Sequence, residues 1–285
     1  KILYSFFMII WIASYPKSGN TYIRSFLSAY FFSKNGDFDF ELLKNIEQFP
    51  DKQFFKGFVN NLDVASQNWL PIQRDIVKRK KVKFLKTHSA FISINNNQFT
   101  NADTTLGSVY IVRDPRSIMA SIMNHFSLSQ TEAAEMLFDK NRGIKSSDGN
   151  LATYSFLSNW SNHFNSWNNL QTIKKMLIKY EDLEDKFDEI FKKLIEYINN
   201  LIGNNDGIDH QKFKKALNTT KFSFLKTKEK KEGFLESIYS REKEQSIPFF
   251  NKGFSNDWEK KLDEKIRKRI EDEFHKEMKQ LGYLV

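Results

Sequence analysis

A short polar run near the start of the chain has the residue types and spacing of an anion-binding site. It reads Ser14-Tyr15-Pro16-Lys17-Ser18-Gly19-Asn20-Thr21, directly after an apolar segment and at the start of a helical pattern. A tight turn into a helix presents backbone N–H groups and a positive dipole end to an anion. Four side chains add donors at the same place: Lys17, Ser18, Asn20 and Thr21. The run predicts a phosphate-binding loop, although Pro16 stands where the Walker pattern GxxxxGK[ST] has a glycine.

A second polar run of this kind follows a later apolar segment. Val112-Arg113-Asp114-Pro115-Arg116-Ser117 leads into a helical pattern in which Ser121 lies eight residues after Arg113. An arginine at the end of a strand offers a bidentate fork to a phosphate, and a proline favours the start of a helix. Taken alone, Arg113 could equally form a structural ion pair with a carboxylate. Beside the first run, phosphate binding is the favoured interpretation.

A third run, Lys86-Thr87-His88, closes the apolar segment from Val82 to Thr87. In a parallel sheet the carboxyl ends of the strands meet at one edge, so this strand would bring His88 to the edge that carries Lys17. A histidine elsewhere in the chain is more often a core residue than a catalytic one. The position of His88 favours a role in the site.

The elements that must position these residues alternate along the chain. The predicted strands are Ile9 to Ala13, Val82 to Thr87, Val109 to Val112 and Met176 to Tyr180. The predicted helices are Ser18 to Phe32, Pro115 to Phe126, Ser129 to Phe138 behind a capping box, Ala152 to Leu170, Phe187 to Leu201, and Leu262 to Leu281. The predicted loops are Asn141 to Asn150, Leu201 to Gln211 and Lys226 to Ile247. This alternation is typical of a parallel sheet with helices on both faces, and no linker divides the chain, so we expect one α/β domain over residues 1–285.

The composition narrows the class of protein. The chain has 285 residues and no cysteine, which excludes disulfides, zinc–thiolate sites and Fe–S clusters and fits a cytoplasmic protein. Its 44 Lys and Arg against 35 Asp and Glu give a net charge of +9, which favours anionic partners. No apolar run reaches the ~18 residues of a membrane span. Ile2 to Ala13 is predicted to be a buried strand rather than a secretory signal, with Met8 as a candidate start and Lys1 to Phe7 as a dispensable extension.

Together the three runs resemble those of sulfotransferases that use 3′-phosphoadenosine 5′-phosphosulfate (PAPS). Tyr15 to Thr21 is similar to the family's YPKSGTTW loop, Arg113 to Ser121 to its VRNPxD…S segment, and Lys86-Thr87-His88 to its KTH element. The resemblance implies a P-loop NTPase-like domain that transfers a sulfuryl group from PAPS to a hydroxyl or amine acceptor without a metal. It also implies that PAPS is a co-substrate, released as its desulfated product PAP.

The resemblance assigns roles to these residues. His88 would be the general base that deprotonates the acceptor, while Lys17 and Lys86 would stabilise charge on the bridging and equatorial oxygens of the transferring group. The residues that would hold the 5′-phosphate are Ser18, Gly19, Asn20 and Thr21, and those for the 3′-phosphate are Arg113, Ser121 and Lys252.

Weaker similarities continue to about Trp258. Tyr180-Glu181-Asp182-Leu183 resembles the family's YEDL element, Thr220-Lys221-Phe222 resembles TSFxxM, and Pro248 to Gly253 followed by Asp257-Trp258 resembles RKG…GDW. These matches imply that Tyr180, Thr220 and Phe222 contact the adenine and that Lys252 and Gly253 close over the 3′-phosphate.

Three departures from the family pattern bear on donor binding. Tyr22 replaces the tryptophan that stacks on adenine, Asn251 replaces the arginine of RKG, and Ser89-Ala90-Phe91 replaces the usual Leu-Pro. They predict weaker donor binding unless Lys252 supplies the missing charge. The family's KxxxTVxxxE dimer motif is not visible, so no oligomeric state is predicted.

Two other functions stay open on the residues alone. One is a P-loop-like kinase that needs Mg²⁺ and prefers ATP, and the other is a non-catalytic binder of anions or nucleic acid that uses the net charge. On the favoured interpretation the partner is a small-molecule or saccharide acceptor, with no nucleic acid and no membrane span. The loops expected to bind the acceptor are Phe31 to Asp51, Phe126 to Asn150 and Lys226 to Ile247.

Overall fold

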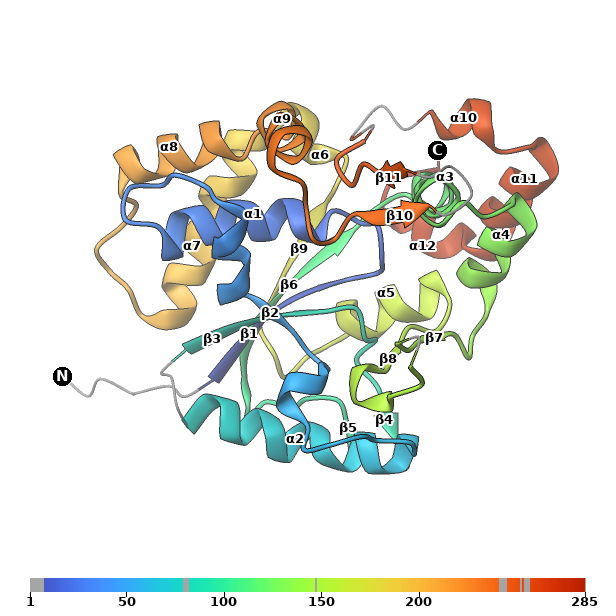
Figure 1. The fold of residues 1–285 in the computed structure, drawn as a ribbon, viewed down its shortest axis with the longest axis horizontal. Coiled ribbons are helices and arrows are strands. Elements are labelled where there is room, and N and C mark those ends of the chain that lie inside the picture. The colour runs from blue at the N-terminus through green and yellow to red at the C-terminus, as the bar shows by residue number, and fades with distance from the viewer. Residues whose placement is uncertain are drawn as a thin grey trace.

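A five-stranded parallel sheet runs through the centre of the molecule in the strand order β2-β3-β1-β6-β9 (Figure 1). The computed structural model describes residues 8–78, 82–146, 148–240, 245–251, 253 and 257–284. The strands of this sheet are β1 Met8–Ser14, β2 Glu47–Gln48, β3 Val82–Thr87, β6 Thr105–Val112 and β9 Lys175–Lys179. Because every pair is parallel, the carboxyl ends of the strands meet at one edge.

Strand β1 contributes side chains to two hydrophobic cores, one on each face of the sheet. Ile9, Trp11 and Ala13 belong to one core, while Ile10 and Ile12 belong to the other. All five are 0% exposed. Successive side chains of a strand point to opposite faces, so a strand buried on both sides needs a continuous apolar run, as this one has.

Helices cover both faces, as Figure 1 shows. The helices that pack on the core with Ile10 are α1 Asn20–Phe32, α6 Asp182–Asp185, α7 Phe187–Ile202, α8 His210–Thr219 and α9 Phe222–Glu232. Those on the core with Trp11 are α2 Leu62–Lys78, α3 Pro115–Phe126, α4 Gln130–Phe138, α5 Trp160–Asn168, α10 Trp258–Lys261, α11 Glu264–Glu273 and α12 His275–Gln280. The expected α/β architecture is therefore confirmed.

Short elements complete the described part of the chain. The 3₁₀ turns are η1 Phe40–Asn45, η2 Lys52–Phe54 and η3 Leu151–Thr153. The paired short strands are β4 Ser93–Ile94 with β5 Asn97–Gln98, β7 Gly143–Ile144 with β8 Ser155–Phe156, and β10 Ile238–Ser240 with β11 Gln245–Ile247. None of the helices within the described ranges is long and apolar enough to span a membrane.

The single helix predicted from Ala152 to Leu170 is wrong. The chain forms η3 and β8 there, and α5 begins only at Trp160. Ser158 has a left-handed φ of 59°, and the Asn159 side chain accepts a hydrogen bond from the backbone N–H of Asn162. This cap fixes the start of the helix and excludes a helical turn before it.

The last predicted helix, Leu262 to Leu281, is divided into α11 and α12. Asp263 caps α11 by accepting from the backbone N–H of Ile266, so Leu262 precedes the helix. The predicted loops are also partly helical. Helix α7 extends to Ile202, α8 starts at His210 behind the Asp209 cap, and α9 continues to Glu232.

Candidate active site

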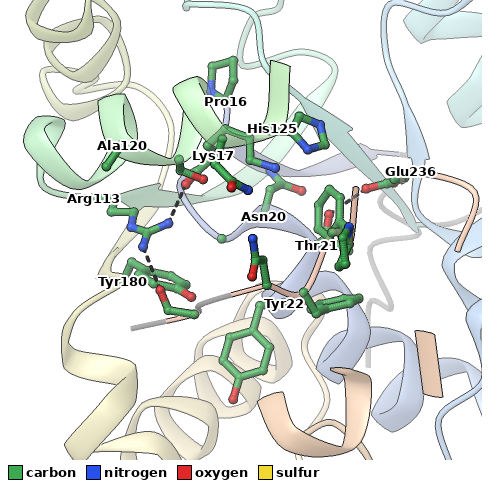
Figure 2. A pocket seen from close by; sticks show the side chains of 18 of the residues that line it. Pro16, Lys17, Asn20, Thr21, Tyr22, Arg113, Ala120, His125, Tyr180 and Glu236 are labelled. Carbon is green, nitrogen blue, oxygen red and sulfur yellow. Dashed lines mark hydrogen bonds between the residues drawn. The ribbon is translucent and has the colours of Figure 1, made fainter. Parts of the chain in front are cut away.

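A cavity of about 280 Å³ opens at the carboxyl edge of the sheet, where the three polar runs meet (Figure 2). Its walls come from the turn after β1, the ends of β3 and β6, helix α3, and the segment after α9. The predicted site residues on its surface are Lys17, Gly19, Asn20, Thr21, Tyr22, Lys86, His88, Arg113, Ser121, Tyr180, Phe222 and Gly253. The fold thus brings together residues that lie more than 200 positions apart in the sequence.

The turn between β1 and α1 needs its glycine. Gly19 has φ 95° and caps α1, and a Cβ atom there would lie 2.3 Å from Cδ2 of the Tyr180 ring. Lys17 also takes a left-handed φ of 65°. Both positions let the turn present the start of α1 to the cavity, and the close approach of Tyr180 fixes the turn against the end of β9.

Asn20 holds this turn from inside. Its Nδ2 donates to the carbonyl of Ile12 at 3.0 Å and to Oγ of Ser14 at 3.1 Å. Asn20 Oδ1 and Ser18 Oγ are buried and have no hydrogen-bond partner among the described residues. Buried polar atoms without partners are uncommon, and of these two the Ser18 hydroxyl is a donor that a phosphate-bearing ligand at this turn would satisfy.

Arg113 joins the ends of three strands. Its NH1 donates to the Lys17 carbonyl and its NH2 to the Gly253 carbonyl, both at 3.0 Å, and its guanidinium lies 4.2 Å from the Tyr180 ring centroid (Figure 2). Its two hydrogen-bond acceptors are carbonyls rather than carboxylates. Nε is buried without a partner among the described residues, so the guanidinium has donor capacity left for a ligand.

The two predicted catalytic lysines lie in an environment that disfavours their charge. Burial and, next, the positive charge of Arg113 lower the pKa of Lys17 to about 7. The Lys17 ammonium lies 4.3 Å from the centroid of the Phe249 ring. Burial also lowers the pKa of Lys86, and the nearby carboxylate of Glu236 opposes this shift. A bound anion would restore the charge of both ammonium groups.

His88 is held in the tautomer that a general base needs. Its Nδ1 lies 2.9 Å from the Ser14 carbonyl, which is an acceptor only, so Nδ1 carries the proton and donates. Nε2 is therefore the unprotonated nitrogen. Burial and then the charge of Lys86 lower the pKa of His88 to about 3, which keeps the imidazole neutral at ordinary pH.

A second histidine supports the backbone at this position. His163 Nε2 lies 3.0 Å from the His88 carbonyl, and its Nδ1 lies 2.8 Å from the Tyr110 hydroxyl. With Nε2 as the donor, Nδ1 accepts from Tyr110, so both ring nitrogens are satisfied in the neutral form. Burial lowers the pKa of His163 to about 4.

The remaining predicted residues differ in their relation to the cavity. Thr220 does not line it, because its buried hydroxyl donates to the carbonyl of Ala216 at 2.7 Å. Ser18 is buried within the turn and does not line the cavity surface. Tyr22 stacks on Phe187 and meets the edge of Phe222, which forms an aromatic wall. Lys252 and the predicted extension at residues 1–7 lie outside the described residues.

Sequence reasoning did not single out several residues of the cavity, and Glu236, His125 and Phe249 are among them. Glu236 lies in the turn after α9, while His125 and Phe249 face each other with ring centroids 5.8 Å apart. No residue spacing marks Glu236, because it lies in a stretch predicted to be a polar loop. His125 ends a predicted helix, and its relation to Lys17 depends on the tertiary fold. Within the described ranges, no three His, Asp or Glu side chains are grouped as a metal site.

An anion-binding turn, two lysines and a neutral histidine on one cavity are typical of an enzyme that transfers a group from a phosphorylated donor. The chain belongs to the sulfotransferase domain family, whose model matches residues 9–282. No curated protein matches the sequence.

Solved structures share the fold. Mouse sulfotransferase SULT7A1, complexed with PAP, aligns with a TM-score of 0.54 and 16% identity over 97% of this chain and 87% of that chain. Retinol dehydratase, in a complex with retinol and PAP, aligns with a TM-score of 0.55 and 18% identity over 95% of this chain and 81% of that chain. At such identities the likeness concerns the fold.

The lowered histidine pKa values predict that mild acid destabilises the protein. Burial lowers the pKa of His125 to about 3, as it does for His88, whereas an unfolded histidine titrates near 6.5. Below about pH 6.5 the unfolded chain therefore binds more protons than the folded chain. The free energy of unfolding then decreases as the pH is lowered. We expect the melting temperature in scanning calorimetry to fall steadily from pH 7 to pH 5. A constant melting temperature would contradict the neutral state of these rings.

Proposed function

We propose that the chain transfers a sulfuryl group from PAPS to a hydroxyl or amine of a small-molecule acceptor. The observation that carries this is the neutral His88, with Nε2 unprotonated, on the same cavity as Lys17, Lys86 and the anion-binding turn. PAP in the complexes of the mouse sulfotransferase and of retinol dehydratase supports the donor. Retinol and androsterone in the retinol dehydratase complexes support a small-molecule acceptor.

The side chains divide the work of the reaction. His88 Nε2 accepts the proton of the acceptor group, and the hydrogen bond from Nδ1 to Ser14 fixes the direction of the lone pair. The ammonium groups of Lys17 and Lys86 stabilise the negative charge that develops on the leaving phosphate and on the sulfuryl oxygens. Bound PAPS would supply an activated sulfuryl group.

The donor would be held by the turn and by Arg113. The buried hydroxyl of Ser18 and the backbone N–H groups at the start of α1 belong to the turn that would bind the 5′-phosphate, and the spare donors of Arg113 would bind the 3′-phosphate. Ser121 lies on the same cavity. The aromatic wall of Tyr22 and Phe222 would contact the adenine. Tyr22 offers a smaller ring than the family's tryptophan, which fits weaker donor binding.

Ligand-dependent melting and a chelation assay test this function against the alternatives. PAP and PAPS should raise the melting temperature more than ATP with Mg²⁺ or an oligonucleotide does, because only they carry the matching 3′-phosphate. Transfer from ³⁵S-labelled PAPS to a panel of phenols, alcohols, amines and saccharides should persist in EDTA. Activity that EDTA abolishes and Mg²⁺ restores would favour the kinase, and stabilisation by the oligonucleotide alone would favour the non-catalytic binder.

A further inference from the structure

One carboxylate lies among the positive charges of the cavity. Glu236 Oε2 accepts a hydrogen bond from the Thr21 hydroxyl at 2.7 Å (Figure 2). Its Oε1 lies 2.8 Å from Arg24 NH1 and 3.5 Å from Lys86 Nζ. Among the described residues that line the cavity it is the only carboxylate. The cations on the same surface are Lys17, Lys86, Arg113 and Lys261.

We propose that Glu236 is a positioning residue of the transfer reaction: it holds the Lys86 ammonium at the cavity, fixes the Thr21 side chain at the start of α1, and keeps the lysine charged. This inference rests on the proposed function. Neither contact involves the acceptor or the transferring group, so Glu236 acts through the two residues that it holds.

The carboxylate itself is fixed by a buried arginine. Arg24 is 5% exposed, and its NH2 also donates to the carbonyl of Ile46 at 3.1 Å. The charges of Lys86 and then Arg24 hold the pKa of the carboxyl well below its usual range against burial, and Arg24 is a permanent counter-charge because an arginine stays charged in proteins. Glu236 therefore remains ionised over the whole range in which the lysines titrate.

The turn that carries Glu236 is fixed from the other side by Glu229 of α9. Glu229 Oε1 accepts from the Ser237 hydroxyl at 2.5 Å and from the Phe249 N–H at 2.6 Å, and its Oε2 accepts from the Phe250 N–H at 2.8 Å. The same buried carboxylate thus places Glu236 next to Lys86 and the Phe249 ring next to Lys17. The groups next to Lys86 and Lys17, which are Glu236 and Phe249, therefore both belong to the segment that follows α9.

Electrostatics decides what the loss of Glu236 would do. Lys86 is 8% exposed, and a buried ammonium without a counter-charge loses its proton more easily. Glu236 raises the pKa of both Lys86 and Lys17, against burial and against the neighbouring cations. Removing its charge would therefore lower both pKa values, so the lysines would become neutral at a lower pH.

Glu236→Gln, which keeps the shape and removes the charge, tests the inference. The alkaline limb of the pH profile of kcat/KM for PAPS reports the free enzyme, and we expect it to move down by about one pH unit, with roughly tenfold lower kcat/KM at pH 8. An NMR titration of the ¹³C-labelled protein without donor should show the same downward shift in the pKa values of Lys17 and Lys86. Glu232→Gln is the matched control, because Glu232 forms a more exposed ion pair with Lys228 on α9, and it should leave the pH profile and the titrations of Lys17 and Lys86 unchanged.

Two results would overturn the inference. One is a Glu236→Gln enzyme with an unchanged alkaline limb and unchanged lysine titration. The other is a variant that binds PAP more tightly and turns over faster, which would make the carboxylate a competitor of the donor. If Glu236→Gln does not fold, Glu236→Asp can replace it, because the shorter side chain reaches Lys86 less well. Its alkaline limb should shift by an intermediate amount, and a pH profile equal to that of the wild type would overturn the proposal. A wild-type protein that binds no PAP would instead refute the proposed function, while the lysine titration would still test the contact.

Discussion

Replacing His88 by alanine should lower the turnover of sulfuryl transfer by about 10²–10⁴-fold and leave the affinity for PAP nearly unchanged. The loss corresponds to about 3–5 kcal/mol of activation free energy. The reason is that His88 lines the cavity as a neutral imidazole with Nε2 unprotonated, whereas the groups proposed to bind the donor belong to the turn after β1 and to Arg113. Turnover is measured with labelled PAPS and the best acceptor of the panel, and affinity by calorimetry with PAP.

The controls separate chemistry from stability. His88→Asn keeps a donor near the Ser14 carbonyl and removes the base, so it should lose as much turnover as the alanine variant. His275→Ala changes an exposed histidine at the start of α12 and should change neither quantity. If His88 were only a structural residue, its truncation would destabilise the fold by roughly 1–3 kcal/mol with little loss of rate per folded molecule.

The parallel sheet and the turn after β1 were predictable because local chemistry determines them. The run from Ile9 to Ala13 is apolar at every position, which only a strand buried on both faces requires. The start of α3 was equally visible, because Pro115 occupies the first turn and Asp114 accepts from the backbone N–H of Arg116. Each of these signals lies within a few neighbouring residues.

The interrupted helices could not be located in the same way. An asparagine such as Asn159 is compatible with a helix interior, a cap or a loop, and its role here depends on Ser158 adopting a left-handed backbone. At the C-terminal end, Leu262 continues the apolar stripe, although Asp263 starts a new helix beside it. The spacing of apolar residues indicates which face of a helix is buried, but it does not indicate where the helix is interrupted.

The place of Glu236 among the cations of the cavity could not be predicted from the sequence for a different reason. Glu236 meets Arg24 across 212 positions and Thr21 across 215 positions. No motif links a carboxylate in a lysine-rich stretch to a turn at the other end of the chain. The sequence therefore indicated the cationic and polar residues of the cavity and did not indicate the carboxylate of Glu236 that lies among them.

Arg113→Ala should remove most of the preference of the protein for PAP over AMP. If the spare donors of Arg113 bind the 3′-phosphate, each charge-assisted hydrogen bond contributes roughly 1.5–3 kcal/mol, so losing one lowers PAP affinity about 10- to 150-fold. AMP lacks the 3′-phosphate and reports any damage to the turn, which Arg113 also supports through the carbonyls of Lys17 and Gly253. Calorimetry with both nucleotides on both proteins gives a thermodynamic cycle in which that structural contribution cancels.

Arg113→Lys separates charge from geometry in the same cycle. Lysine keeps the positive charge near the Tyr180 ring, but it lacks the planar fork that holds two acceptors at fixed angles, so it should recover only part of the preference. Equal affinities of the wild-type protein for PAP and AMP would refute the assignment. So would an Arg113→Ala protein that loses both affinities by the same factor, because Arg113 would then act on the turn alone. A selective loss of PAP affinity, partly restored by lysine, is the result that only direct recognition of the 3′-phosphate explains.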